Sequence, residues 1–275
     1  KHFSQNFIVH SCLPTPGDNV GALNVQHRTL SLHGMSLSTN SWFESWPCSV
    51  YDTGACPSGT GGQAVSIRIA ESQAAGVGFH VWQAARMLCR YLEREQENAV
   101  SGPIPPGSKI LELGSGCGLV GILCARLGAD VTLTDTASVL PLTCHNAKVN
   151  EHLWAQHGVI RAIELPWGCE LPTSVDKGEF DVIIGSDLTY FEHLHGPLLL
   201  ATLLQLVTER TTVILAHVHR NDQLRFWRRR FKQFFHLEVV WTDDMLDGSR
   251  EQSMIAPRED LARCSGDDSG EKLGQ

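Results

Sequence analysis

The sequence predicts an α/β fold, in which helices cover both faces of a mainly parallel sheet. From residue 78 onward, short apolar segments alternate with segments of helical periodicity, as in parallel sheets that are covered on both faces. A glycine-rich turn joins one apolar segment directly to a helical one, at the edge where α/β sheets bind ligands. The chain has 275 residues, of which 42% are hydrophobic and 19% charged, and these values suit a fold with a buried core.

The first part of the chain, residues 1–77, is predicted to form an N-terminal β extension. Apolar or alternating residues predict strands at 7–10, 23–32 and 64–70. Residues 34–63 are rich in Ser, Thr, Gly, Pro and Asn, which predicts a flexible loop. We therefore separate this segment from the alternating strands and helices that follow it.

The main domain is predicted to span residues 78–256, and the polar residues 257–275 are predicted to be a disordered tail. Helices are expected where apolar residues recur at helical spacing, at 81–94, 119–127, 139–150, 198–208 and 223–234. Strands are expected at the apolar runs 109–113, 129–135, 158–164, 180–187, 211–217 and 235–241. Beyond these runs, only residues 253–256 could supply a last strand.

Charge and hydropathy argue against nucleic-acid and membrane partners. The formal net charge is −8, whereas tight nonspecific binding to nucleic acid needs many phosphate-neutralising residues. No apolar run approaches the length of a membrane span, and the N-terminal residues lack the pattern of a secretory signal. We therefore expect a monomer in the cytoplasm, with the nucleus as a second location.

The spacing of cysteine and histidine predicts no metal site. The nine cysteines are scattered without a C-x-x-C pair, which indicates neither a disulfide framework nor a zinc site. Such cysteine usage suits a reducing compartment. His217 and His219 lie two residues apart at the end of a predicted strand, but no further ligand is evident.

The glycine-rich turn at residues 112–118 has the sequence ELGSGCG and is the first candidate ligand site. Glycines let the backbone turn sharply and approach a ligand, and the helix that follows offers free N–H groups. A dinucleotide fingerprint needs G-x-G-x-x-G, but Leu119 occupies the sixth position here and the third glycine comes one residue early. The candidate contacts in this turn are Glu112, Gly114, Ser115, Gly116 and Gly118.

Together with Asp135, which closes the second predicted strand, this turn resembles the class I, seven-strand methyltransferases that use S-adenosylmethionine. The resemblance implies a Rossmann-like sheet, glycines that flank the methionine part of the cofactor, and an Asp135 carboxylate that binds the ribose hydroxyls. A carboxylate suits that task because it can accept two hydrogen bonds from a diol. The alternative is a helix-capping turn that binds no ligand.

Three further motifs narrow the resemblance. GFHVWQAA at 78–85, PWG at 166–168 and DLTY at 187–190 follow one another as in methyltransferase family 16, the nonhistone protein methyltransferases. The resemblance covers residues 65–241. It implies a protein substrate such as a chaperone or translation factor, with lysine as the usual acceptor and histidine as the acceptor of at least one member.

The same resemblance assigns three residues to the cofactor. It places Trp82 against the cofactor, although packing of Trp82 in the core of the protein is an alternative. Trp167 lies between Pro and Gly in a loop, which suits stacking near the adenine better than a role as a core anchor. Ser186 is the small residue before the D-x-x-Y acid, and its backbone is expected beside the cofactor.

Asp187 and Tyr190 are the candidate catalytic residues because they end a buried strand on the ligand-binding side. A lysine ammonium has no lone pair and must lose a proton before it can attack a methyl group. We expect Asp187 to orient the ammonium and Tyr190 to shape the acceptor channel, with strand-end capping as the alternative. Because a carboxylate is a much weaker base than an amine, deprotonation through water is preferred to Asp187 as a general base.

The predicted function is therefore a protein-lysine N-methyltransferase. The alternatives are a protein-histidine methyltransferase of the same family, a nicotinamide-dependent oxidoreductase and a non-catalytic adaptor that binds the cofactor. Enzymes that act on amide or base nitrogens commonly carry an N/D-P-P-Y motif, and DLTY has no proline. This difference and the acidic charge argue against methylation of DNA or RNA.

Overall fold

The computed structural model describes residues 5–12, 29–30, 41–54, 63–98, 102–188, 192–218 and 229–242. Lys1–Thr242 form one compact unit. The second unit, Asp243–Gln275, lies outside the described residues, as do the predicted last strand at 253–256 and the predicted tail.

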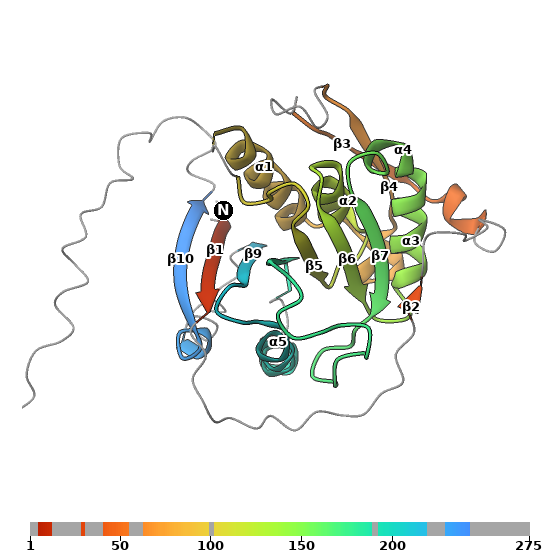
Figure 1. The fold of residues 1–275 in the computed structure, drawn as a ribbon. Coiled ribbons are helices and arrows are strands. Elements are labelled where there is room, and N and C mark those ends of the chain that lie inside the picture. The colour runs from red at the N-terminus through yellow and green to blue at the C-terminus, as the bar shows by residue number, and fades with distance from the viewer. Residues whose placement is uncertain are drawn as a thin grey trace, which may run out of the picture. The chain divides into compact units, whose positions relative to one another are not determined.

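Within the described residues, the core is an eight-stranded sheet with the order β10-β1-β9-β8-β5-β6-β7-β2 (Figure 1). The strands β7, β6, β5, β8 and β9 are parallel neighbours, which confirms the predicted α/β class. Their bounds are β5 (Lys109–Leu113), β6 (Asp130–Asp135), β7 (Val159–Glu164), β8 (Val182–Ser186) and β9 (Thr212–Val218).

The N-terminal strand β1 (Gln5–Cys12) lies inside this sheet, between β9 and β10 (Phe235–Thr242), and is antiparallel to both. Ile8, for example, faces Leu215 on β9 and Val239 on β10. The short strand β2 (Thr29–Leu30) pairs with β7 at the opposite edge. Strands from the predicted extension thus complete the central sheet, and the periodicity that identified them carries no information about their partners.

A separate two-stranded sheet consists of β3 (Cys48–Asp52) and β4 (Ser66–Ala70). The expectation of a loop over 34–63 was wrong in part, because this segment contains β3 and the 3₁₀ turn η2 (Ser41–Ser45). Tyr51 on β3 is buried, as are Ile67 and Ile69 on β4. Burial of these alternate side chains outweighs the polar composition of the segment.

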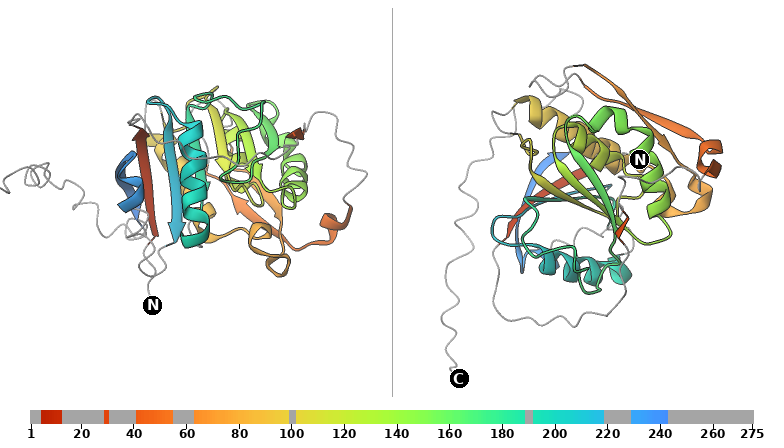
Figure 2. Two further views of the ribbon diagram at one scale, coloured as in Figure 1. Left: turned by 90° about the horizontal axis from the view of Figure 1, so that it is seen from below. Right: turned by 45° about the vertical axis from the view of Figure 1, so that its right-hand side comes forward.

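Helices cover the two faces of the central sheet. They are α1 (Gln83–Asn98), α2 (Leu119–Arg126), α3 (Leu140–Val149), α4 (Glu151–Trp154) and α5 (Glu192–Leu206). In the right-hand view of Figure 2, α5 lies on the face of the sheet opposite α1 and α2. Of the helix predicted at 223–234, residues 229–231 are helical and 223–228 lie outside the described residues.

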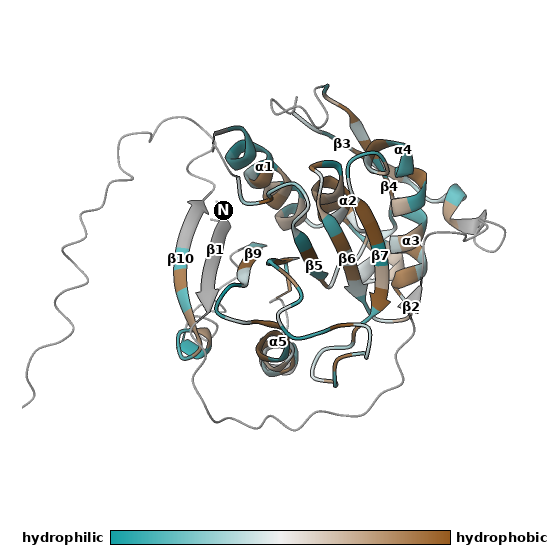
Figure 3. Ribbon diagram, in the orientation of Figure 1, coloured by the Kyte–Doolittle hydropathy of each residue, from teal (hydrophilic) through white to brown (hydrophobic). Residues whose placement is uncertain are grey.

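The core between α5 and the sheet is strongly apolar. Leu199, Leu203 and Leu206 recur at helical spacing on α5 and are fully buried against Leu113 and Ile183 of the sheet cluster. In Figure 3, β7 and much of α5 are correspondingly brown. This packing fixes the position of the loops that follow β7 and β8.

Candidate active site

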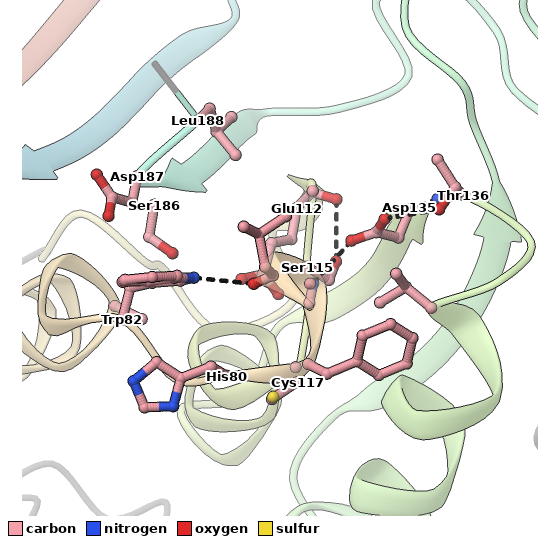
Figure 4. A pocket seen from close by; sticks show the side chains of 18 of the residues that line it. His80, Trp82, Glu112, Ser115, Cys117, Asp135, Thr136, Ser186, Asp187 and Leu188 are labelled. Carbon is pink, nitrogen blue, oxygen red and sulfur yellow. Dashed lines mark hydrogen bonds between the residues drawn. The ribbon is translucent and has the colours of Figure 1, made fainter. Parts of the chain in front are cut away.

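A cavity of about 590 Å³ lies at the carboxyl ends of β5, β6 and β8 (Figure 4). The 3₁₀ turn η4 (Val77–Phe79), the start of α1 and the loops after β5, β6, β7 and β8 form its walls. Ten of the predicted site residues line it: Trp82, Glu112, Gly114, Ser115, Gly116, Gly118, Asp135, Trp167, Ser186 and Asp187. Tyr190, the remaining one, lies outside the described residues.

The glycine loop after β5 needs glycine for both conformation and space. Gly114 and Gly116 have φ of +58° and +52°, in the left-handed region that favours glycine. A Cβ atom at Gly114 would lie 2.8 Å from a methyl carbon of Leu188, and one at Gly116 would lie 3.2 Å from the Gly78 carbonyl oxygen. The loop therefore packs tightly on its neighbours and presents backbone to the cavity.

Ser115 ties the glycine loop to β6. Its backbone N–H donates to the Thr134 carbonyl over 2.8 Å, and its Oγ accepts from the Thr134 N–H over 2.9 Å. The same hydroxyl donates to the Glu112 carbonyl over 3.2 Å. Ser115 lines the cavity as predicted, but its hydroxyl proton is already used in this internal bond.

Glu112 supports the loop from within the protein. Its side chain is 1% exposed and accepts a 3.0 Å hydrogen bond at Oε2 from the N–H of Gly121 on α2. Burial raises the pKa of this carboxyl to about 8, so it holds its proton at neutral pH. Glu112 thus joins the end of β5 to α2 as a neutral group.

Asp135 lies at the end of β6, where its carboxylate accepts hydrogen bonds from the glycine loop and from Thr136. Its Oδ2 accepts from the Gly116 N–H over 2.9 Å, and its Oδ1 accepts from the Thr136 N–H over 2.7 Å. Burial raises the pKa of this carboxyl, while the two amides oppose the rise. Oδ1 also accepts a long, 3.4 Å bond from the Thr136 hydroxyl, whereas Oδ2 accepts only from Gly116 among the described residues. Oδ2 can therefore accept from one hydroxyl of a diol, and Oδ1 can accept from the other in exchange for the long Thr136 bond.

Two tryptophans form aromatic walls of the cavity. Trp82 is half-buried, and its Nε1 donates to the Val77 carbonyl over 2.9 Å, which holds the ring across the cavity wall. Trp167 is also half-buried, and its ring edge contacts His195 at a centroid distance of 6.2 Å. The loop that carries Trp167 is fixed to α5 by a 2.8 Å bond from the Gly168 N–H to Thr202 Oγ1.

Asp187 follows β8 in an unusual conformation. Among the described residues it is the one non-glycine with a positive φ, at 55°, a conformation that costs on the order of 1–3 kcal/mol and that clusters at functional sites. Its N–H donates to the Ala216 carbonyl over 2.7 Å, so the strain is held by the β8–β9 pairing. The side chain lines the cavity and is only 5% exposed.

The structure also gives roles to residues outside the predicted site list. His195 and Leu198 line the cavity and belong to none of the recognised motifs, whereas His80 lies within the GFHVWQAA motif but was not among the predicted site residues. Asn146 on α3 accepts from the Ala70 N–H and donates to the carbonyls of Ala70 and Cys117, over 2.8, 3.0 and 3.0 Å. It therefore ties β4 and the glycine loop to α3.

Asn150 makes an equivalent pair of bonds one helical turn later. Its Oδ1 accepts from the Arg68 N–H over 3.0 Å, and its Nδ2 donates to the Arg68 carbonyl over 2.7 Å. The signal for this clamp in the sequence is the spacing of four residues between Asn146, which is on α3, and Asn150, which caps its C-terminal end.

The parallel sheet, the glycine loop and the acid at the end of the second parallel strand define a class I methyltransferase. The family model for lysine methyltransferases matches residues 62–237, and the chain belongs to this family. EEF1A lysine methyltransferase 3 of Mus musculus is 37% identical over 172 residues, which are 62% of this chain and 68% of the mouse protein. Protein N-lysine methyltransferase METTL21A of Danio rerio is 35% identical over 172 residues, which are 62% of this chain and 75% of the fish protein.

Family membership confirms three predictions: a methyltransferase activity, S-adenosylmethionine as the cofactor and a protein lysine as the acceptor class. The predicted roles of individual residues, the monomeric state and the cellular location stay predictions. Among the helices that the structure describes, none is long and apolar enough to cross a membrane.

Proposed function

We propose that this cavity binds S-adenosylmethionine and that the chain transfers its methyl group to the ε-amine of a lysine in a folded protein. The observation that carries this proposal is the strained Asp187, which lies on the cavity wall one residue after β8. The volume of about 590 Å³ is within the usual range of small-molecule sites.

Each part of the cavity suits one part of the cofactor. The glycine loop offers backbone without side chains to the methionine part. Asp135 has a lone pair left on Oδ2 for one ribose hydroxyl, and Oδ1 can exchange its long Thr136 bond for the other. Trp167 provides an aromatic surface for the adenine. When bound, S-adenosylmethionine supplies an electrophilic methyl group on its sulfonium.

Asp187 acts on the acceptor in this proposal. Its carboxylate accepts hydrogen bonds from the lysine ammonium and holds the nitrogen in line with the methyl carbon. The ammonium gives one proton to water, and the amine lone pair then forms the N–C bond as the C–S bond breaks. Trp82 and Leu188, which line the same cavity, keep water away from the reacting atoms.

The first substrate to test is translation elongation factor 1A, because the mouse relative is named for it. Purified protein, tritiated S-adenosylmethionine and elongation factor 1A are incubated together, with a cell lysate as a second substrate source, and labelled peptides are mapped. We expect label on a lysine. Label on histidine would contradict the lysine acceptor, and cofactor binding without any transfer would favour the adaptor.

A further inference from the structure

Glu71 and His80 form a carboxylate–imidazole pair on the wall of the cavity. His80 Nδ1 lies 2.6 Å from Glu71 Oε2, and the same oxygen accepts a 2.7 Å bond from the Val81 N–H. The ring of His80 also makes an edge contact with Trp82, at a centroid distance of 5.1 Å and an angle of 83°. The contacts with Glu71 and Trp82 therefore fix the orientation of the His80 side chain, and the Val81 bond fixes Glu71.

Residues 71–80, which carry this pair, form a loop whose ends are joined by a hydrogen bond and which packs on the glycine loop. The Ser72 N–H donates to the Phe79 carbonyl over 2.7 Å, which brings the two ends of the segment together. The carbonyl oxygen of Gly78 would lie 3.2 Å from a Cβ atom at Gly116. The charge of Glu71 also acts on the thiol of Cys117 in that loop.

His80 thus lies at the glycine-loop end of the cavity. In the view of Figure 4, His80 and Cys117 lie on one side of the Trp82 ring, and Ser186 and Asp187 lie on the other. In the proposed function, the glycine-loop end receives the methionine part of the cofactor. His80 is therefore placed for binding that part rather than for contact with the acceptor lysine.

The methionine part ends in an α-carboxylate and an α-ammonium group. Among the described residues that line the cavity, only His80 and His195 can carry a positive charge, and no lysine or arginine lines it. His195 contacts Trp167, at the part of the cavity proposed for the adenine. Burial raises the pKa of the Cys117 thiol, so this residue of the glycine loop stays neutral and adds no charge to the cavity.

We propose that His80, oriented by Glu71, binds the α-carboxylate of S-adenosylmethionine. When both ring nitrogens carry a proton, Nδ1 donates to Glu71 and the Nε2–H is presented to the α-carboxylate, while Glu71 balances the charge. Glu71 is a positioning residue, and its fixed bond to Val81 holds it in place. This proposal rests on the proposed cofactor orientation. A hydrogen bond between charged groups here corresponds to an affinity ratio on the order of 10- to 100-fold.

Decarboxylated S-adenosylmethionine isolates this contact, because it lacks only the α-carboxylate. Calorimetric titration of wild type and His80→Gln with both ligands gives four dissociation constants. We expect His80→Gln to bind S-adenosylmethionine about 10- to 100-fold more weakly and to bind the decarboxylated ligand within about threefold of wild type. An equal loss for both ligands would mean that the pair only shapes the 71–80 segment, and would overturn the proposal.

Two further variants complete the test. Glu71→Gln keeps an acceptor for Val81 and His80 but removes the charge, so we expect a smaller loss that is again confined to S-adenosylmethionine. His195→Gln is the matched control, and it should not distinguish the two ligands. If wild type bound neither ligand, the proposed function itself would fail. If wild type bound S-adenosylmethionine and His80→Gln bound it equally well, only the role of His80 would be wrong.

Discussion

The two halves of the central sheet are assembled in different ways. The half β8-β5-β6-β7 is parallel and comes from consecutive segments between Lys109 and Ser186. In the other half, β1 from the N-terminal part of the chain lies between β9 and β10, which come from its C-terminal part. The candidate active site belongs to the first half, because the strands at its wall are β5, β6 and β8. The strands that form the candidate active site are therefore different from the strands that complete the sheet, and the two groups can be perturbed separately.

The largest expected effect comes from breaking the antiparallel half. Val9 faces Ile214 on β9 and Glu238 on β10, and proline at this position cannot donate to the ladder. We expect Val9→Pro to lower the free energy of unfolding by about 3 kcal/mol or more, measured by urea denaturation. Affinity for S-adenosylhomocysteine at low temperature, where the variant is still folded, should stay within about threefold of wild type.

The matched control for Val9→Pro is Thr29→Pro. Thr29 lies in the two-residue strand β2, which pairs with β7 alone among the described strands, so the loss should be below about 1 kcal/mol. Equal stabilities of Val9→Pro and Thr29→Pro would contradict the position of β1 inside the sheet.

A smaller effect is expected from the two asparagines that clamp β4 to α3. Removing the Asn146 side chain leaves buried backbone groups without this partner, and removing that of Asn150 leaves partly buried ones, so we expect losses of about 2 and about 1 kcal/mol for the two alanine variants. Only Asn146 also bonds the Cys117 carbonyl of the glycine loop. Asn146→Ala should therefore weaken binding of S-adenosylhomocysteine severalfold, and Asn150→Ala should not. Calorimetry of both variants decides whether the clamp supports the site, and equal affinities would show that it does not.

The smallest effect concerns the proton of Glu112. Its pKa of about 8 in the folded protein exceeds that of an unfolded glutamate, so the folded state holds a proton that the unfolded state releases above about pH 4.5. Stability therefore falls as pH rises from about 4.5 to 8 and levels off above that. Glu112→Gln removes this dependence, so it should gain stability relative to wild type by on the order of 2 kcal/mol between pH 6 and 8. Parallel pH profiles of the two proteins in urea denaturation would show that Glu112 is ionised in the fold.

The sequence predicted the parallel half of the sheet correctly but did not predict how the antiparallel half is assembled. The parallel half is encoded locally, because strand, turn and helix signals around ELGSGCG follow one another within a short segment. The predicted site residues that the structure describes come together in one cavity because parallel strands bring their carboxyl ends to one edge of the sheet. The position of β1 depends on pairing between distant segments, and periodicity identifies a strand without indicating its partners.

His80 illustrates the limit within the site. It lies inside the recognised GFHVWQAA motif, but its partner Glu71 lies nine residues earlier, directly after β4 and outside the motif. Their contact depends on the closure of the segment between them, which no local signal in the sequence indicates. The formation of β3 and the burial of its Tyr51 are a similar case, because the polar composition around them predicted a loop.

The central claim is that the cavity of the parallel half binds the cofactor and that Asp187 directs the acceptor. The most direct measurement compares wild type with Asp187→Asn in methyl transfer and in calorimetric binding of S-adenosylhomocysteine. We expect transfer to fall by on the order of 100-fold or more, because charge attraction to the ammonium is lost, while cofactor affinity changes by less than about threefold. Undiminished transfer, or a parallel loss of transfer and cofactor affinity, would contradict the role proposed for Asp187.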